Sequence, residues 1–244
     1  MTEFISLGEN CLPDDVLSFL GLKNESYPFG GGRFNIEYII QLIESDFEGL
    51  LDTENLSWGQ TEAKAVVRNN HYTFKHDIYS ETVTLGFEFT HHNVFEEAPR
   101  RSFVRKIERF RKVLQSGNNI VFFYNYRYSE KNDIKTLENL IEQFLDALKK
   151  KYGHQYKCLI VYQTLNQPTR AISTRQNESI FIAEFITKNE WEGDEYWNGS
   201  PDRDLFKKLY DSSSFQKFVY GPAYLIRPLI TKSKSLIKKI LGLS

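Results

Sequence analysis

Residues 4–22 read FISLGENCLPDDVLSFLGL, and this stretch predicts the unit from which the fold is built. Residues 4–7 form a short apolar run that is typical of a buried strand, and residues 8–10 form a turn. Pro13 suits the first turn of a helix, where its missing N–H leaves no hydrogen bond unmade. The sequence therefore predicts a strand followed at once by a helix, which ends near Gly21.

The same alternation continues in the second half of the chain. Apolar residues at helical spacing predict helices over residues 100–117 and 134–152, the second closed by Gly153. Apolar runs over residues 119–126, 157–163 and 179–186 predict buried strands. Strands that alternate with helices in this way indicate an α/β domain with a mostly parallel central sheet flanked by helices.

The region between these units has a different pattern. Asn35 can cap a helix, and the apolar spacing after it predicts an amphipathic helix over residues 36–47. Residues 52–64 are loop-like, whereas residues 65–90 mix β-branched and aromatic residues with polar ones and predict two or more strands. We expect one domain over residues 1–211 and a basic amphipathic tail over residues 212–244.

Composition limits the function and the setting. A chain of 244 residues with 41% hydrophobic residues can build one sizeable core. A formal charge of -1 argues against nucleic-acid binding, which usually requires a basic excess. The cysteines, Cys11 and Cys158, do not indicate a disulfide framework, and no signal peptide or membrane-spanning stretch is visible. We expect a cytoplasmic protein.

Cys11 stands where the first predicted strand gives way to a helix. Ligands of open α/β sheets collect at the carboxyl ends of the strands, and a helix N-terminus favours thiolate over thiol. Backbone N–H groups of this turn can also stabilise an oxyanion, so we expect Gly8, Asn10 and Leu12 to form the oxyanion environment. The alternative is a structural cysteine, because free cysteine is among the most buried residue types.

A nucleophilic cysteine needs a base, which is most often a histidine. His71 and His76 are five residues apart and would point to opposite faces of a strand, so at most one faces the site. Asp77 would likewise point away from His76. The pair His91–His92, in what looks like an exposed loop, is a rival source of the base. The histidine spacing gives no good indication of a metal site.

Several motifs together resemble a known family. They are ISLGENC (5–11), YPFGGG (27–32), FKHD (74–77), RSFVRKIERF (101–110) and NIVFFYNYR (119–127), in this order. The set resembles a bacterial family of papain-like cysteine peptidases that often occurs near functions of surface-polysaccharide biosynthesis. The resemblance implies Cys11 as the nucleophile and His76 as its base, with Asp77 nearby.

One position departs from the family pattern. The family usually has an Asp after the Pro-Phe pair, and this chain has Gly30 there. If that Asp orients the base or binds substrate, this chain lacks the group. The glycines could instead open the pocket or let the backbone approach a bulky ligand.

Peptide cleavage needs a nucleophile, a base and an oxyanion hole, and acyl transfer from a thioester needs the same groups. A cysteine just after the first strand also loosely resembles the arrangement in small α/β esterases and in some capsule acetyltransferases that use coenzyme A. We expect cysteine-dependent acyl transfer or hydrolysis in surface-polysaccharide biosynthesis, acting on a glycan or lipid-linked glycan. No cofactor is required, and a coenzyme A thioester is a candidate acyl donor. The alternatives are a papain-like cysteine peptidase and a non-catalytic module that binds a glycan or a membrane.

Two further features suggest binding surfaces. Basic residues crowd the helix over residues 100–117, so Arg101, Arg105 and Arg109 could hold an anionic donor, although a solvated face is the commoner explanation. Trp191 and Trp197 could stack on carbohydrate or could cover the sheet.

The tail is the other basic segment. Residues 223–244 combine an apolar stripe at helical spacing with lysines on the remaining surface. This pattern is typical of a helix lying on an anionic membrane, which would place the protein peripherally at the inner membrane. The alternative is a terminal helix docked on the domain or on a partner.

Overall fold

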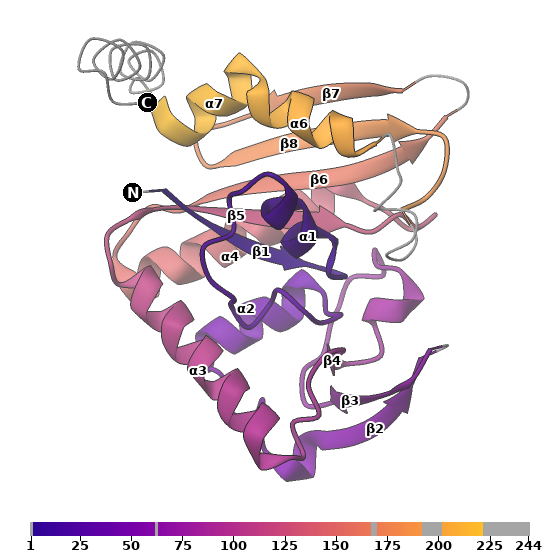
Figure 1. Ribbon diagram of the computed structural model, residues 1–244, viewed down its shortest axis with the longest axis vertical. Coiled ribbons are helices and arrows are strands. Elements are labelled where there is room, and N and C mark those ends of the chain that lie inside the picture. The colour runs from indigo at the N-terminus through magenta and orange to yellow at the C-terminus, as the bar shows by residue number, and fades with distance from the viewer. Residues whose placement is uncertain (1, 62, 167–169, 192–201, 222–244) are drawn as a thin grey trace, which may run out of the picture.

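The strand and helix predicted from residues 4–22 are β1 (Thr2–Gly8) and α1 (Leu12–Phe19). Figure 1 shows the computed structural model, which describes residues 2–61, 63–166, 170–191 and 202–221. The main sheet has five strands in the order β1-β5-β6-β8-β7. β1, β5 (Asn119–Tyr126), β6 (Lys157–Leu165) and β8 (Ile180–Thr187) are parallel, which confirms the predicted α/β architecture.

Helices cover both faces of this sheet (Figure 1). α2 (Ile36–Glu44), α3 (Glu97–Leu114) and α4 (Ile134–Tyr152) pack on one face, and α1, α6 (Arg203–Asp211) and α7 (Ser213–Tyr220) pack on the other. Neighbouring strand residues serve opposite cores, as Phe122 and Phe123 of β5 do. Asn35 caps α2 as predicted, accepting a hydrogen bond from the Tyr38 N–H (3.0 Å), and Gly153 ends α4 in a left-handed conformation.

A smaller antiparallel sheet contains the two strands predicted within residues 65–90 and one strand in a segment predicted to be a loop. Its strands are β2 (Leu56–Gln60), β3 (Ala65–Asn69) and β4 (Phe87–Phe89), in that order, so β2 lies in a segment predicted to be a loop. The segment with His71 and His76 contains no strand. Its backbone is held by side chains of α2 instead, since the Glu37 carboxylate accepts hydrogen bonds from the N–H groups of Lys75 (2.9 Å) and His76 (3.3 Å). Short 3-10 helices at Thr53–Asn55 (η1) and Glu81–Val83 (η2) complete the region.

The remaining departures are at the C-terminal side. β7 (Ala171–Gln176) was not predicted; it pairs antiparallel with β8 at the edge of the main sheet. Residues 213–220, assigned to the tail above, form α7, whose Phe215 and Phe218 are buried in the core. The membrane-surface helix predicted over residues 223–244 lies outside the described residues. In the part of the chain that the structure describes, no helix has the length and apolar character needed to cross a membrane.

A buried acid fixes the end of β1. Glu9 has no exposed surface, and its carboxylate accepts hydrogen bonds from the Tyr124 hydroxyl (2.9 Å) and the Arg127 backbone N–H (3.3 Å). Burial raises the pKa of Glu9 to about 8, although both hydrogen bonds oppose the shift. The β1–α1 turn is thereby tied to the carboxyl end of β5.

This burial predicts a pH-dependent stability. The unfolded chain releases the Glu9 proton near pH 4.5, whereas the folded chain keeps it up to about pH 8. Because the folded state binds more protons in this range, stability falls as the pH rises through it, by up to roughly 1.4 kcal/mol per pH unit. Glu9→Gln cannot ionise, so its free energy of unfolding in urea should decline less between about pH 5 and about pH 8 than that of the wild type.

The exposed Glu108 of α3 offers a matched control. Glu108→Gln should keep the pH dependence of the wild type. Parallel curves for the wild type and Glu9→Gln would contradict the assigned role of the buried carboxylate.

Candidate functional site

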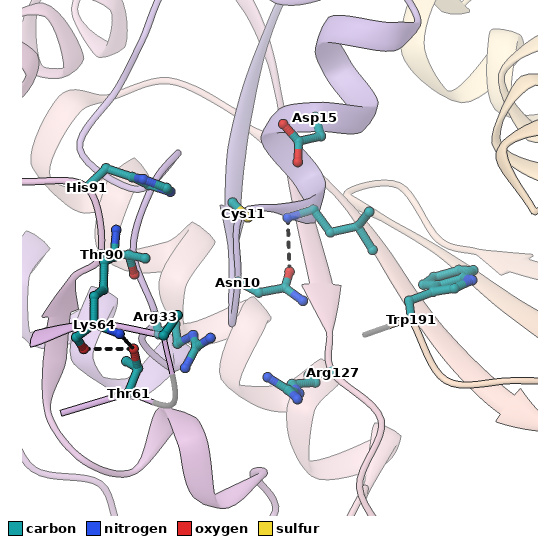
Figure 2. Close-up of a pocket in the computed structure, with 12 residues that line it drawn as sticks. Asn10, Cys11, Asp15, Arg33, Thr61, Lys64, Thr90, His91, Arg127 and Trp191 are labelled. Atoms are coloured by element: carbon teal, nitrogen blue, oxygen red, sulfur yellow. Dashed lines mark hydrogen bonds between the residues drawn. The ribbon is translucent and has the colours of Figure 1, made fainter. Parts of the chain in front are cut away.

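A cavity of about 400 Å³ opens at the carboxyl ends of β1 and β5, where ligands bind in open α/β sheets (Figure 2). Six separate segments contribute to its wall: the β1–α1 turn, the glycine loop before α2, the β2–β3 turn, and the chain after β4, after β5 and after β8. The lining residues are Asn10, Cys11, Leu12, Asp15, Arg33, Thr61, Ala63, Lys64, Thr90, His91, Arg127 and Trp191.

The two cysteines differ in access to this cavity. Cys11 is partly exposed and is the N-cap residue of α1, with its carbonyl accepting hydrogen bonds from the N–H groups of Asp14 (3.0 Å) and Asp15 (3.2 Å). Cys158 is fully buried in β6, and burial raises the pKa of its thiol. Cys11 is therefore the thiol that a substrate in the cavity can reach, and its place at a helix N-terminus favours the thiolate.

The turn residues predicted to form the oxyanion environment have different roles. Asn10 Oδ1 accepts a hydrogen bond from the Leu12 N–H (3.1 Å), which engages that N–H and orients the side-chain amide. The Nδ2 group of Asn10 is then available as a hydrogen-bond donor beside Cys11. Gly8 is not among the lining residues; a Cβ there would lie 2.9 Å from Cγ of Pro13, so the glycine allows α1 to pack closely on β1.

His91 is the histidine that shares the cavity with Cys11. Figure 2 shows its ring pointing toward Cys11 from the segment that follows β4. The neighbouring His92 instead turns toward α3, where its Nε2 lies 2.7 Å from Nζ of Lys106, and burial lowers the pKa of His92 to about 4. Of the pair considered above as a rival source of the base, His91 alone is therefore placed for chemistry at Cys11.

The structure does not bring His76 to this cavity. His76 is not a lining residue, and its Nδ1 lies 3.1 Å from Oε1 of Glu37. Asp77 is exposed and pairs with Lys131 (2.8 Å). The histidine that lies at the cavity, His91, is 15 positions further along the chain than the one that the family resemblance implied.

The arginines proposed as an anion site on α3 also lie apart from the cavity. Arg101 pairs with Glu97 one helical turn earlier, Arg109 donates a hydrogen bond to the Ser26 carbonyl (2.8 Å), and Arg105 is exposed. None of the three is a lining residue. The cations that line the cavity are Arg33, Lys64 and Arg127. They come from three segments far apart in the sequence, so they form no local motif that the sequence could reveal.

Trp191 helps to cover the sheet while one side of it borders the cavity. It is 6% exposed, packs against Phe185 and Phe206, and donates its indole N–H to Asp202 (3.0 Å). The second tryptophan considered for carbohydrate stacking, Trp197, lies outside the described residues. Within the described ranges, no three His, Cys, Asp or Glu side chains gather closely enough to hold a metal ion.

The fold and cavity together define an α/β protein with an accessible thiol at the carboxyl end of its first strand. Residues 2–166 match the family described as "Putative papain-like cysteine peptidase (DUF1796)", and the chain belongs to this family. The match confirms the family resemblance and extends it through β6. An uncharacterized protein of Acanthamoeba polyphaga mimivirus is 25% identical over 215 residues, which cover 79% of this chain and 92% of that protein. No solved structure gave a significant match.

At Gly30, where the family usually has an Asp, a carboxylate from α1 lies close to the backbone. A Cβ at Gly30 would lie 2.7 Å from Oδ1 of Asp14 and 3.0 Å from Oγ of Ser6. Asp14 is held there by hydrogen bonds from Ser6 (3.0 Å) and Lys23 (2.6 Å). A carboxylate from α1 therefore occupies the space that a side chain after the Pro-Phe pair would enter.

This arrangement predicts coupling between the two positions. Gly30→Asp should lower the free energy of unfolding by roughly 2 kcal/mol, because the new side chain meets the Asp14 carboxylate. Adding Asp14→Gly removes the clash, so the double variant should be more stable than the sum of the single changes predicts. Urea unfolding of the wild type, the two single variants and the double variant measures this coupling.

Asp15 provides the control, since it is the neighbouring acid of the same helix turn. Asp15→Gly combined with Gly30→Asp should show additive losses. Additive losses in the Asp14 cycle as well would contradict the assignment of the Asp14 carboxylate to this space.

Proposed function

We propose that this chain hydrolyses or transfers an acyl group through a thioester formed on Cys11. The observation that carries the proposal is that Cys11 and His91 line one cavity, with the imidazole ring directed toward Cys11 (Figure 2). A thiol, a nearby base and a hydrogen-bond donor for the oxyanion are the parts that this chemistry requires. Membership of a family described as cysteine peptidases supports a cysteine nucleophile.

Cys11 acts as nucleophile, His91 as base and then acid, and Asn10 as oxyanion donor. His91 takes the proton of Cys11, and the thiolate attacks the carbonyl carbon of the substrate. The resulting oxyanion accepts a hydrogen bond from Nδ2 of Asn10. Collapse of the tetrahedral intermediate breaks the bond to the leaving group, which receives the proton from His91. Water or an acceptor hydroxyl then attacks the thioester, gives its proton to His91 and releases Cys11.

The identity of the second nucleophile separates the two finer forms of the proposal. Attack by water on an acyl-enzyme derived from a peptide is peptidase chemistry, which the family description supports. Attack by a sugar hydroxyl is glycan acylation, with a thioester such as that of coenzyme A as the donor, and we propose surface-polysaccharide biosynthesis as its setting.

An aromatic surface beside the cavity supports a sugar-containing acceptor. Trp58 is 59% exposed, and its ring lies 5.4 Å from that of Phe95. A shallow groove connects Trp58 with three residues that also line the Cys11 cavity: Lys64, Thr90 and His91. Exposed aromatic rings offer flat apolar faces against which the C–H face of a sugar can pack. The groove would thus bring an acceptor hydroxyl toward His91.

The thiolate–imidazole pair is tested by the pH dependence of Cys11 alkylation with iodoacetamide. We expect the apparent pKa of Cys11 to lie below the ordinary thiol value of about 8.5 and to rise in His91→Ala, because the imidazolium stabilises the thiolate. His76→Ala is the matched control and should leave this pKa unchanged. Mass spectrometry locates the label, and buried Cys158 should remain unmodified.

Two outcomes would contradict the assignment. A shift in His76→Ala without one in His91→Ala would make His76 the base. A Cys11 that is not alkylated in the native protein would remove the nucleophile.

Turnover assays distinguish the reactions. Peptide cleavage that is lost in Cys11→Ala would identify a peptidase, whereas transfer from an acyl thioester to a glycan would identify a transferase. Binding of a glycan without turnover, unchanged in Cys11→Ala, would overturn the proposal in favour of a non-catalytic module.

A further inference from the structure

We infer that the Cys11 cavity selects substrates that carry a carboxylate or phosphate group, held by the guanidinium groups of Arg33 and Arg127. This inference rests on the proposed function, because it assigns a substrate class to the same site. Neither residue belongs to the basic helix that sequence analysis singled out.

Arg33 is fixed through its backbone and leaves its guanidinium available. Its N–H and C=O pair with the backbone of Glu88 (3.2 and 2.9 Å), which anchors the residue beside β4. Its Nε lies 3.8 Å from Oε1 of Glu88, beyond hydrogen-bond distance. The Glu88 carboxylate is already satisfied by two hydrogen bonds from Arg68 (3.1 and 3.0 Å) and one from Thr90 (3.1 Å). Arg33 is therefore an additional cation, not the main partner of Glu88.

Arg127 is also held in place beside the cavity. Its backbone N–H bonds to Glu9, and its Nη1 donates to the Thr82 hydroxyl (3.2 Å). Its Nε lies 3.6 Å from Oε1 of Glu190, an ion-pair distance that is too long for a good hydrogen bond. The side chain is 20% exposed, so the charge is partly shielded from water. This guanidinium is positioned before any substrate arrives.

Both arginines line the same cavity as Asn10 and Cys11 (Figure 2). Lys64 adds a third cation to the lining, and Asp15 is the only acidic residue among the lining residues named above. Guanidinium forks match the geometry of carboxylate and phosphate oxygens and bind them through charge-assisted hydrogen bonds. The carboxylates paired with Arg33 and Arg127 lie at 3.8 Å and 3.6 Å, so both guanidinium groups can still donate charge-assisted hydrogen bonds to an anionic substrate. A neutral peptide or sugar offers no such acceptor, so the wall of the cavity favours an anionic substrate.

Two alkylating reagents of nearly equal size test this selectivity. Iodoacetate and iodoacetamide both form a bond from Sγ to carbon and release iodide, but only iodoacetate carries a carboxylate. We expect the iodoacetate-to-iodoacetamide rate ratio at Cys11 to exceed the ratio for glutathione by about tenfold at low salt, the equivalent of one charge-assisted hydrogen bond. Arg33→Ala and Arg127→Ala should each remove most of this excess. Arg101→Ala, on the exposed face of α3, should preserve it.

A competition experiment uses the wild-type protein alone, so its result does not depend on whether a variant folds. Inorganic phosphate and malonate should protect Cys11 from iodoacetamide in a saturable manner, and the stronger protector identifies phosphate or carboxylate as the preferred group. Protection should weaken as ionic strength rises. Protection by neither anion, together with a rate ratio equal to that of glutathione, would overturn the anion inference while leaving the nucleophile intact. A Cys11 that reacts with neither reagent would instead overturn the proposed function.

Discussion

The buried carboxyl group of Glu9 is the constraint on which the site depends. It accepts a hydrogen bond from Tyr124, which belongs to the core beneath α2, α3 and α4. Three residues later, Leu12 packs in the core on the opposite face. The chain therefore crosses from one face of the sheet to the other within the turn that contains Cys11. The second hydrogen bond of Glu9 holds the backbone of Arg127, so one buried group positions both the thiol and a cation.

The glycine loop is the second constraint, and its role is to allow close backbone contact. A Cβ at Gly32 would lie 2.5 Å from the carbonyl oxygen of Glu88, and one at Gly31 would lie 3.4 Å from the His91 ring. A side chain at Gly32 would push the loop away from β4, whereas one at Gly31 would meet the His91 ring at ordinary contact distance. The loop instead places Arg33 beside Glu88 and leaves room for His91. From the sequence, the glycines could open the pocket or let the backbone approach a ligand; the close approach in the structure is to the smaller sheet.

Local patterns in the sequence predicted most of the main sheet and its helices, and failed where structure depends on distant partners. β1, β5, β6 and β8 are continuous apolar runs because helices bury them on both faces. β7 is an edge strand with mostly exposed residues, so it has no apolar run to detect. The segment with His76 resembled a strand, but the carboxylate of Glu37 takes the place of a neighbouring strand. Cys11 could be identified from one turn, whereas His91, Arg33 and Arg127 meet only in the folded chain.

The charges at the cavity also constrain how the thiol is activated. In the proposed mechanism, Arg33 and Arg127 would favour the thiolate of Cys11 before a substrate binds, along with His91 and the N-terminus of α1. The proposed anionic substrate would neutralise the two arginines on binding, and their contribution to the thiolate would then be lost when the nucleophile is needed. The substrate would not neutralise the imidazolium of His91 or the partial positive charge at the N-terminus of α1 in this way. Activation of the thiol and recognition of the anion are therefore assigned to different groups, and each can operate while the other is engaged.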